Sequence, residues 1–312
     1  MSMGSIVTVP NITQIGKVEP YISVETFKDD PLSNSLDLSQ LVEGGSQSAQ
    51  DSAIMRMILR ASAKIDNHTC GPTGTLNATQ VTKQGQSFVN REGCVTVNPG
   101  EPRLLGVTAA EWGYQMGAWS QVPVDAYHLW VEETTIRIKI AGGTGTVQFA
   151  GIGDLSALFQ NRSLNGKVYV NYTYLAGWPN SFTSLATGMA GDTSLTVVDP
   201  TGFMQGMETT IWDGIGTETN FVSSVSGNVI TFTSPLLYNH GFGVNVTTLP
   251  ASVQQACMHF IIGMIKSRGQ GGIVISSDGS AEAVGSRADA ISNDEAIAYD
   301  LLDQFVATSG RQ

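Results

Sequence analysis

Residues Ser48–Cys70, SAQDSAIMRMILRASAKIDNHTC, form the segment around which the rest of the chain is organised. Its apolar residues recur at steps of three and four, which places them on one side of a helix; they are Ile54, Met57, Ile58, Ala61 and Ile65. Ser48 with Asp51 three residues later forms a start signal of capping-box type, and Gly71-Pro72 forms a stop. The spacing predicts one amphipathic helix, whose apolar side needs partners elsewhere in the chain.

Those partners are expected near the far end of the chain. Leu249-Pro250 opens a second helix that runs through Lys266, with proline at the first helical position. Asn293, followed by Asp294 and Glu295, is expected to cap a third helix. The apolar faces of these two helices consist of Val253, Ala256, Cys257, Phe260, Ile261, Met264 and Ile265, and of Ile297, Leu301, Leu302, Phe305 and Val306. The pattern predicts a small helical bundle formed by both ends of the chain.

Between these helices the apolar pattern changes to the period of two that is typical of strands. Asn165-Gly166 is a strong hairpin signal, and a series of short strands follows at the spacing of small barrels or sandwiches. The predicted fold class is therefore α+β. Its parts are an N-terminal arm (1–46), the first bundle helix (47–71), an antiparallel β domain (72–185), a small β-barrel or sandwich-like insertion (186–249), and C-terminal bundle helices with a Gly/Ser loop (250–312, loop 269–287).

Composition narrows the class of protein. Of 312 residues, 41% are hydrophobic, which is typical of a globular chain, while only 14% are charged, as expected where neighbouring subunits cover the surface. A low-charge β protein without such interfaces is the alternative. The net charge of −11 and the absence of a cluster of basic residues argue against a protein that binds nucleic acid through its phosphates. The three cysteines are expected to be reduced thiols of an intracellular protein, without a secretory signal or membrane span.

Motifs for catalysis or cofactors are weak. His68 and Cys70, together with Cys257 and His259, offer two His and two Cys, but residues two apart on a helix point in different directions, so zinc is not expected. The chain has no G-x-S-x-G motif, and its glycine clusters lack the full G-x-G-x-x-G pattern. We expect no catalytic residues, no cofactor and no metal, hence a protein that is not an enzyme.

Aromatic residues leave a second interpretation open. Trp112, Trp119 and Trp178 lie in the predicted β region, where they belong either to the core and interfaces or to an exposed groove. An exposed groove would indicate a β-rich binding module, such as a carbohydrate-binding or tail-associated protein.

Several stretches together resemble a known family. They are RASAKID (60–66), FVNREGCVTVNPGEPRLLGVTAAEWGY (88–114), VYVNYTYLAGWPNS (168–181), TSLTVVDPTGFMQGMETTIWDG (193–214) and LPASVQQACMHFIIGMI (249–265). Their order is similar to that of head-to-tail adaptor (connector) proteins of long-tailed bacteriophages, in the larger actinobacteriophage-type form. The resemblance covers most of residues 21–308 and is one of order and pattern.

The resemblance implies a structural virion protein at the head–tail junction, present in the host cytoplasm during assembly. Such proteins form a homo-oligomeric ring of roughly a dozen subunits. The ring joins the capsid portal protein to a downstream stopper or tail-completion protein, and double-stranded DNA passes through its lumen without sequence-specific binding. No membrane takes part.

Three groups of residues are candidate partner contacts. Arg56, Arg60 and Lys64 follow one another at steps of four on the first helix, and they form either a seam to the next subunit's carboxylates or a solvated face. The other two groups belong to the loop and the tail that we expect to reach the portal or a neighbour; they are Ile273, Val274 and Ile275, and Ser309, Gly310, Arg311 and Gln312.

Overall fold

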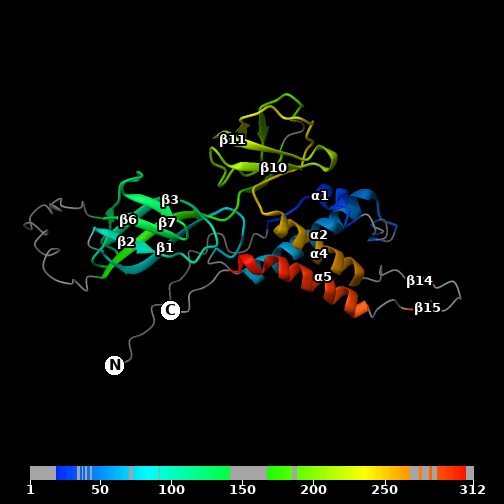
Figure 1. Ribbon diagram of the computed structural model, residues 1–312, viewed down its shortest axis with the longest axis horizontal. Coiled ribbons are helices and arrows are strands. Elements are labelled where there is room, and N and C mark those ends of the chain that lie inside the picture. Colours follow the sequence, from blue (N-terminus) through cyan, green and yellow to red (C-terminus); the bar gives the residue numbers. More distant parts are fainter. Residues whose placement is uncertain are drawn as a thin grey trace, which may run out of the picture.

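The computed structural model describes residues 19–33, 36, 38, 41–42, 44–69, 73–90, 92–140, 167–184, 188–267, 274–275, 281–282 and 287–306. These residues form three units, each with its own apolar core. A β domain and a helical bundle lie at opposite ends of the molecule, and a smaller β unit lies above the bundle in the view of Figure 1. The α+β class is confirmed, and both ends of the described chain contribute to the bundle.

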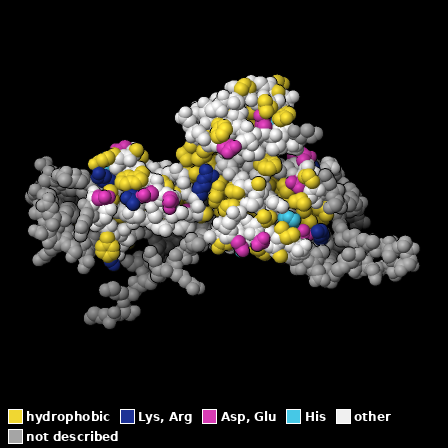
Figure 2. All heavy atoms as spheres, viewed as in Figure 1, with side chains coloured by type: hydrophobic (Ala, Val, Ile, Leu, Met, Phe, Trp, Pro, Cys, Tyr) yellow, Lys and Arg dark blue, Asp and Glu magenta, His cyan; other side chains and the backbone are white. Residues whose placement is uncertain are grey.

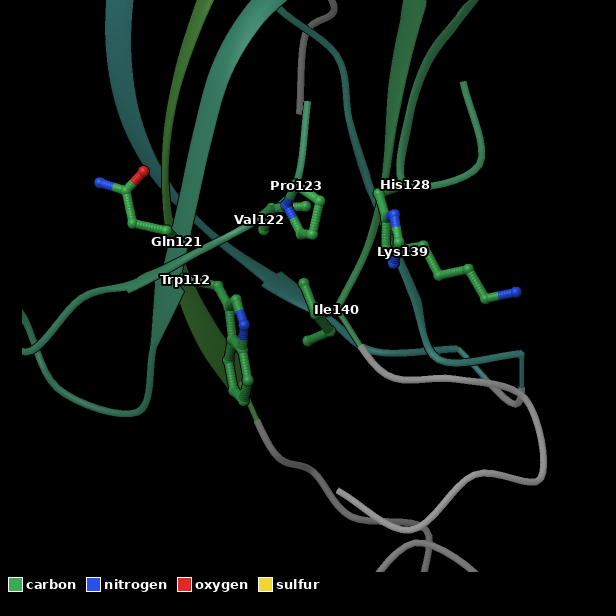
Figure 3. Close-up of a pocket in the computed structure, with 7 residues that line it drawn as sticks. All are labelled: Trp112, Gln121, Val122, Pro123, His128, Lys139 and Ile140. Carbon is green, nitrogen blue, oxygen red and sulfur yellow. The ribbon is translucent and has the colours of Figure 1, made fainter. Parts of the chain in front are cut away.

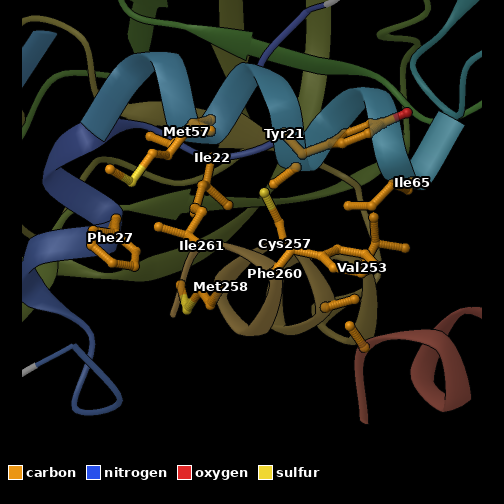
Figure 4. Close-up of a cluster of buried hydrophobic side chains, with 14 of the residues drawn as sticks. Tyr21, Ile22, Phe27, Met57, Ile65, Val253, Cys257, Met258, Phe260 and Ile261 are labelled. Carbon is orange, nitrogen blue, oxygen red and sulfur yellow. The ribbon is translucent and has the colours of Figure 1, made fainter. Parts of the chain in front are cut away.

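The bundle is built around α2 (Gln47–Thr69), as its periodicity predicts. Its partners are α1 (Val24–Asp29), α4 (Ala251–Ile265) and α5 (Arg287–Leu302), which ends in the 3-10 turn η5 (Asp303–Phe305). The apolar stripe of α2 is buried against α4, whose side chains are buried on most sides because α1, α2 and α5 surround it. Figure 4 shows Ile22, Met57 and Cys257 meeting between α2 and α4.

The third helix begins at Arg287, earlier than the expected cap at Asn293. Asp294 lies inside the helix and is 6% exposed, with one carboxylate oxygen 2.7 Å from Lys266 Nζ and the other 3.3 Å from His259 Nδ1. These contacts with His259 of α4 and with Lys266, which follows α4, hold Asp294 in the helix body, so local capping chemistry does not decide where the helix starts.

The β domain consists of two antiparallel sheets that enclose one core. The larger sheet has the order β1-β7-β3-β4, and the smaller has the order β2-β6-β5. Alternate side chains of β7 are buried, as the period-two pattern requires. The strands are β1 (Thr79–Phe88), β2 (Cys94–Val97), β3 (Leu104–Gly113), β4 (Ser120–Gln121), β5 (Leu129–Glu132), β6 (Thr135–Lys139) and β7 (Lys167–Ala176).

The small β unit is a curled six-stranded antiparallel sheet with the order β8-β13-β10-β11-β12-β9. Its first strand, β8, lies within the range 72–185 but pairs with β13 of this unit, so the sheet crosses the boundary expected at 185. The strands are β8 (Asn180–Phe182), β9 (Ser194–Thr196), β10 (Glu208–Trp212), β11 (Glu218–Ser226), β12 (Val229–Phe232) and β13 (Asn245–Thr247). The 3-10 turn η3 (Gly214–Gly216) connects β10 to β11.

Some predicted features fall outside the described residues. They are the arm before residue 19, the Asn165-Gly166 hairpin, Cys70, Ile273 and Ser309 to Gln312. Val274 and Ile275 form β14 (Val274–Ile275), which pairs with β15 (Ala281–Glu282).

Candidate functional site

The three units meet at Tyr21, which has no solvent-exposed surface. Its backbone N–H donates to Ser62 Oγ of α2 at 3.1 Å, and its carbonyl oxygen accepts from Asn245 Nδ2 of β13 at 3.1 Å. Figure 4 shows the ring lying against α2 beside Ile22. The backbone of one residue thus links the bundle to the small β unit.

The hydroxyl group of Tyr21 adds the β domain to this junction. It donates to Asp66 Oδ1 of α2 and accepts from the backbone N–H of Leu76, which lies just before β1, at 2.9 Å. Burial raises the pKa of Asp66 to about 6, although the hydrogen bonds from Tyr21 and Thr75 act in the opposite direction. Burial and the neighbouring Asp66 carboxylate both raise the pKa of Tyr21, so its hydroxyl remains a donor.

Asparagine side chains extend the same junction. Asn180 Nδ2 of β8 donates to the carbonyl oxygen of Pro20 at 3.1 Å and lies 3.2 Å from Asn77 Oδ1 at the start of the β domain. Asn77 and Asn245 are almost fully buried. Because buried polar groups are costly to leave unpaired, these contacts fix the relative positions of the units.

A groove on the surface of α2 holds two of the three predicted basic residues. The side-chain amide of Gln50 donates to Val42 O and accepts from Val42 N, each at 2.8 Å, which attaches the preceding segment to the helix. The resulting groove has a volume of about 100 Å³. Its lining consists of Leu41, Val42, Ala53, Arg56, Met57 and Arg60.

Lys64, the third basic residue of the row, lies apart from this groove. Its Nζ is 2.6 Å from Glu295 Oε1 of α5, so it pairs within the chain. Arg56 and Arg60 are exposed, and neither forms an ion pair with a described residue. The structure therefore divides the predicted row into a groove pair and one residue that joins two bundle helices.

The two histidines considered for zinc lie beside different carboxylates. His68 Nε2 is 3.2 Å from Asp303 Oδ1, whereas His259 faces Asp294. Among the described residues, no group of three or more His, Cys, Asp or Glu side chains is arranged to hold a metal ion. Burial raises the pKa of the Cys257 thiol to about 12, so it is a core side chain and a poor nucleophile.

The tryptophans of the binding-module interpretation lie in different surroundings: Trp112 and Trp178 belong to different cores, and Trp119 is half-buried just before β4. Trp112 is 7% exposed and belongs to the core of the β domain, whereas Trp178 packs edge-to-face on Phe305 of the bundle. A small pocket of about 90 Å³ lies next to Trp112, with His128 and Lys139 among its lining residues (Figure 3). Lys139 donates to the hydroxyl of Tyr127 at 2.6 Å, so this cation already has a partner.

No protein-family model matches the chain, and no curated protein matches it. In the part of the chain that the structure describes, no helix is both long enough and apolar enough to cross a membrane. The Tyr21 junction and the Gln50–Val42 contact were not expected from the sequence. Each depends on residues far apart in the sequence or on an irregular segment, and neither leaves a periodic signal.

Proposed function

We propose that this protein is a structural virion subunit that assembles into a ring between the capsid portal and the downstream neck or tail proteins of a bacteriophage. The observation that carries the proposal is the groove on α2, where Arg56 and Arg60 stand beside an apolar floor. Arginine next to apolar surface is typical of protein–protein interfaces. The resemblance to head-to-tail adaptor proteins of long-tailed bacteriophages supports the proposed position of the ring in the virion.

The charge of the chain supports contacts between copies. Each copy carries 27 acidic and 16 basic residues, so the groove of one copy meets a second copy that is rich in carboxylates. Opposite charges across an interface favour the correct register and faster association. A net charge of −11 also repels DNA phosphates, which suits passage of a duplex through a lumen without binding.

The buried junction between the three units also supports a structural role. The junction at Tyr21 joins the bundle, the β domain and the small β unit through buried hydrogen bonds. Units held in this way keep one arrangement, so several surfaces of a subunit can contact different partners at fixed angles.

The test is the mass of the native protein, alone and with the cognate portal protein. We expect a ring for the wild type and a loss of assembly of at least tenfold for the double variant R56E/R60E. Lys167→Glu is the matched control, because it reverses an exposed charge at the start of β7, away from the groove. If R56E/R60E assembles as well as K167E, the groove is not a subunit contact.

A further inference from the structure

The loop between β12 and β13 exposes large apolar side chains. Leu237 is 71% exposed and Tyr238 is 44% exposed. Met189 is 60% exposed and lies beside them, because Gly188 and His240 exchange backbone hydrogen bonds and Ala190 N donates to Asn239 Oδ1. Figure 2 shows both apolar and acidic side chains on the surface of the small β unit, to which this loop belongs. An exposed apolar group of this kind marks an interaction surface.

Buried charged and polar groups hold this loop in place. Glu218 of β11 is 7% exposed, and its carboxylate accepts from the backbone N–H of Leu237 at 2.9 Å. His240, which is fully buried, lies with Nε2 2.6 Å from Glu218 Oε1 and Nδ1 2.9 Å from Asp213 Oδ2. A backbone fixed by groups that are costly to bury presents Leu237 and Tyr238 in one position, which lowers the entropy cost of binding.

The surroundings of the loop are acidic. Asp29 and Tyr238 both lie close to the short turn η3. A methyl group added at Gly214 of this turn would lie 2.6 Å from Asp29 Oδ2, and one added at Gly216 would lie 3.2 Å from Tyr238 Cβ. Asp192 accepts from Met189 N at 2.9 Å. Residues 168–265 contain no lysine or arginine. A partner for this surface must therefore supply both apolar surface and positive charge.

We infer that this loop docks into the α2 groove of a second copy of the chain, with Leu237 against the apolar floor and Asp29 facing the arginines. Each copy carries both halves of the contact, since the groove combines Leu41, Val42 and Met57 with Arg56 and Arg60. A contact between two different surfaces of identical subunits generates a ring when its rotation closes. The inference rests on the proposed function, because it names the contact by which the ring forms.

The contact is tested in the full chain by native mass measurement over a range of protein concentrations. Leu237→Asp places a charge on the apolar contact, and we expect the concentration for half-assembly to rise at least tenfold. Val198→Asp is the control, since Val198 is a similarly exposed residue (59%) of the same unit, next to β9. We expect it to change the midpoint less than twofold.

An exchange of charges tests the proposed contact between Asp29 and the arginines of the groove. Asp29→Lys and Arg60→Glu should each weaken assembly, whereas an equimolar mixture of the two variants should assemble like the wild type. In a ring in which the two variants alternate, each groove with the reversed charge meets a copy whose charge at position 29 is also reversed, and each native groove meets a native Asp29.

Three outcomes count against the inference. A ring that forms equally well with L237D, or a mixture that fails to regain assembly, overturns this contact and leaves the ring itself standing. A wild type that stays monomeric with and without portal protein overturns both the contact and the proposed function.

Discussion

Tyr21 joins all three units through one hydroxyl and two backbone groups. The hydroxyl donates to Asp66 and accepts from Leu76 N, and both partners lie at buried or partly buried positions. Tyr21→Phe keeps the ring but leaves both partners without this hydrogen bond. We expect the free energy of unfolding in urea to fall by about 2 kcal/mol, and Tyr114→Phe at an exposed position to change it by less than ~0.5 kcal/mol. An unchanged urea midpoint for Y21F would show that the junction does not depend on this group.

Asp66 makes the stability of the protein depend on pH. Its pKa is about 6 in the folded protein and 3.8 in the unfolded chain, so the folded state binds the proton more tightly. Stability therefore falls as pH rises from about 4 to about 6 and then stays level with respect to this group. Asp66→Asn removes this loss while keeping an acceptor for Tyr21.

We expect D66N to be more stable than the wild type by about 2 kcal/mol at pH 8 and nearly equal to it at pH 4. Urea unfolding at both pH values checks this. A D66N protein that is less stable at pH 8 would mean that the carboxylate charge contributes favourably at the junction.

At the scale of elements, His240 and Glu218 hold the loop between β12 and β13. His240→Ala removes both ring contacts and leaves the Glu218 carboxylate buried with backbone partners alone. We expect a loss of about 3 kcal/mol in the free energy of unfolding, against less than ~0.5 kcal/mol for Thr219→Ala at an exposed position of β11. Equal unfolding midpoints for the two variants would contradict the role of the buried cluster.

The turn from β7 to β8 requires a glycine. Gly177 has φ +102°, and a methyl group there would lie 2.5 Å from the carbonyl oxygen of Asn77. We expect Gly177→Ala to lower the free energy of unfolding by about 3 kcal/mol. Gly106→Ala in β3 is the matched control, because a methyl group at Gly106 meets no atom within 4 Å, and we expect a change below ~1 kcal/mol. Thermal unfolding of both variants decides this.

Elements that carry their own periodicity were predictable. The stripe from Ile54 to Ile65 defines the buried side of α2, and the alternation along β7 defines its buried face. The pairing of β8 with β13 and the start of α5 at Arg287 were not predictable in the same way, since each depends on a partner far away in the sequence.

The candidate site was predictable only in part. The spacing of Arg56, Arg60 and Lys64 places them on one side of α2, but the Lys64–Glu295 pair spans 231 positions of the sequence and has no local signature. The sequence did not indicate the exposed loop at Leu237. Its position depends on buried contacts of Glu218 and His240, and no turn motif predicts such contacts.

At the scale of the whole molecule, three cores form one body with two surfaces of different character: a basic groove on α2, and an apolar loop on the small β unit with Asp29 of α1 near its base. If the two surfaces bind each other as proposed, repeated contact between copies extends in one direction and closes into a ring when the rotation permits. The low share of charged residues (14%) and the net charge of −11 agree with the proposed subunit contacts and with the proposed passage of DNA without binding.

The most direct test is the native mass of the purified 312-residue protein, with and without the proposed portal partner. We expect a closed ring of roughly a dozen copies, formed alone or on the portal and lost in R56E/R60E. A protein that remains a monomer under both conditions at micromolar concentration would contradict it.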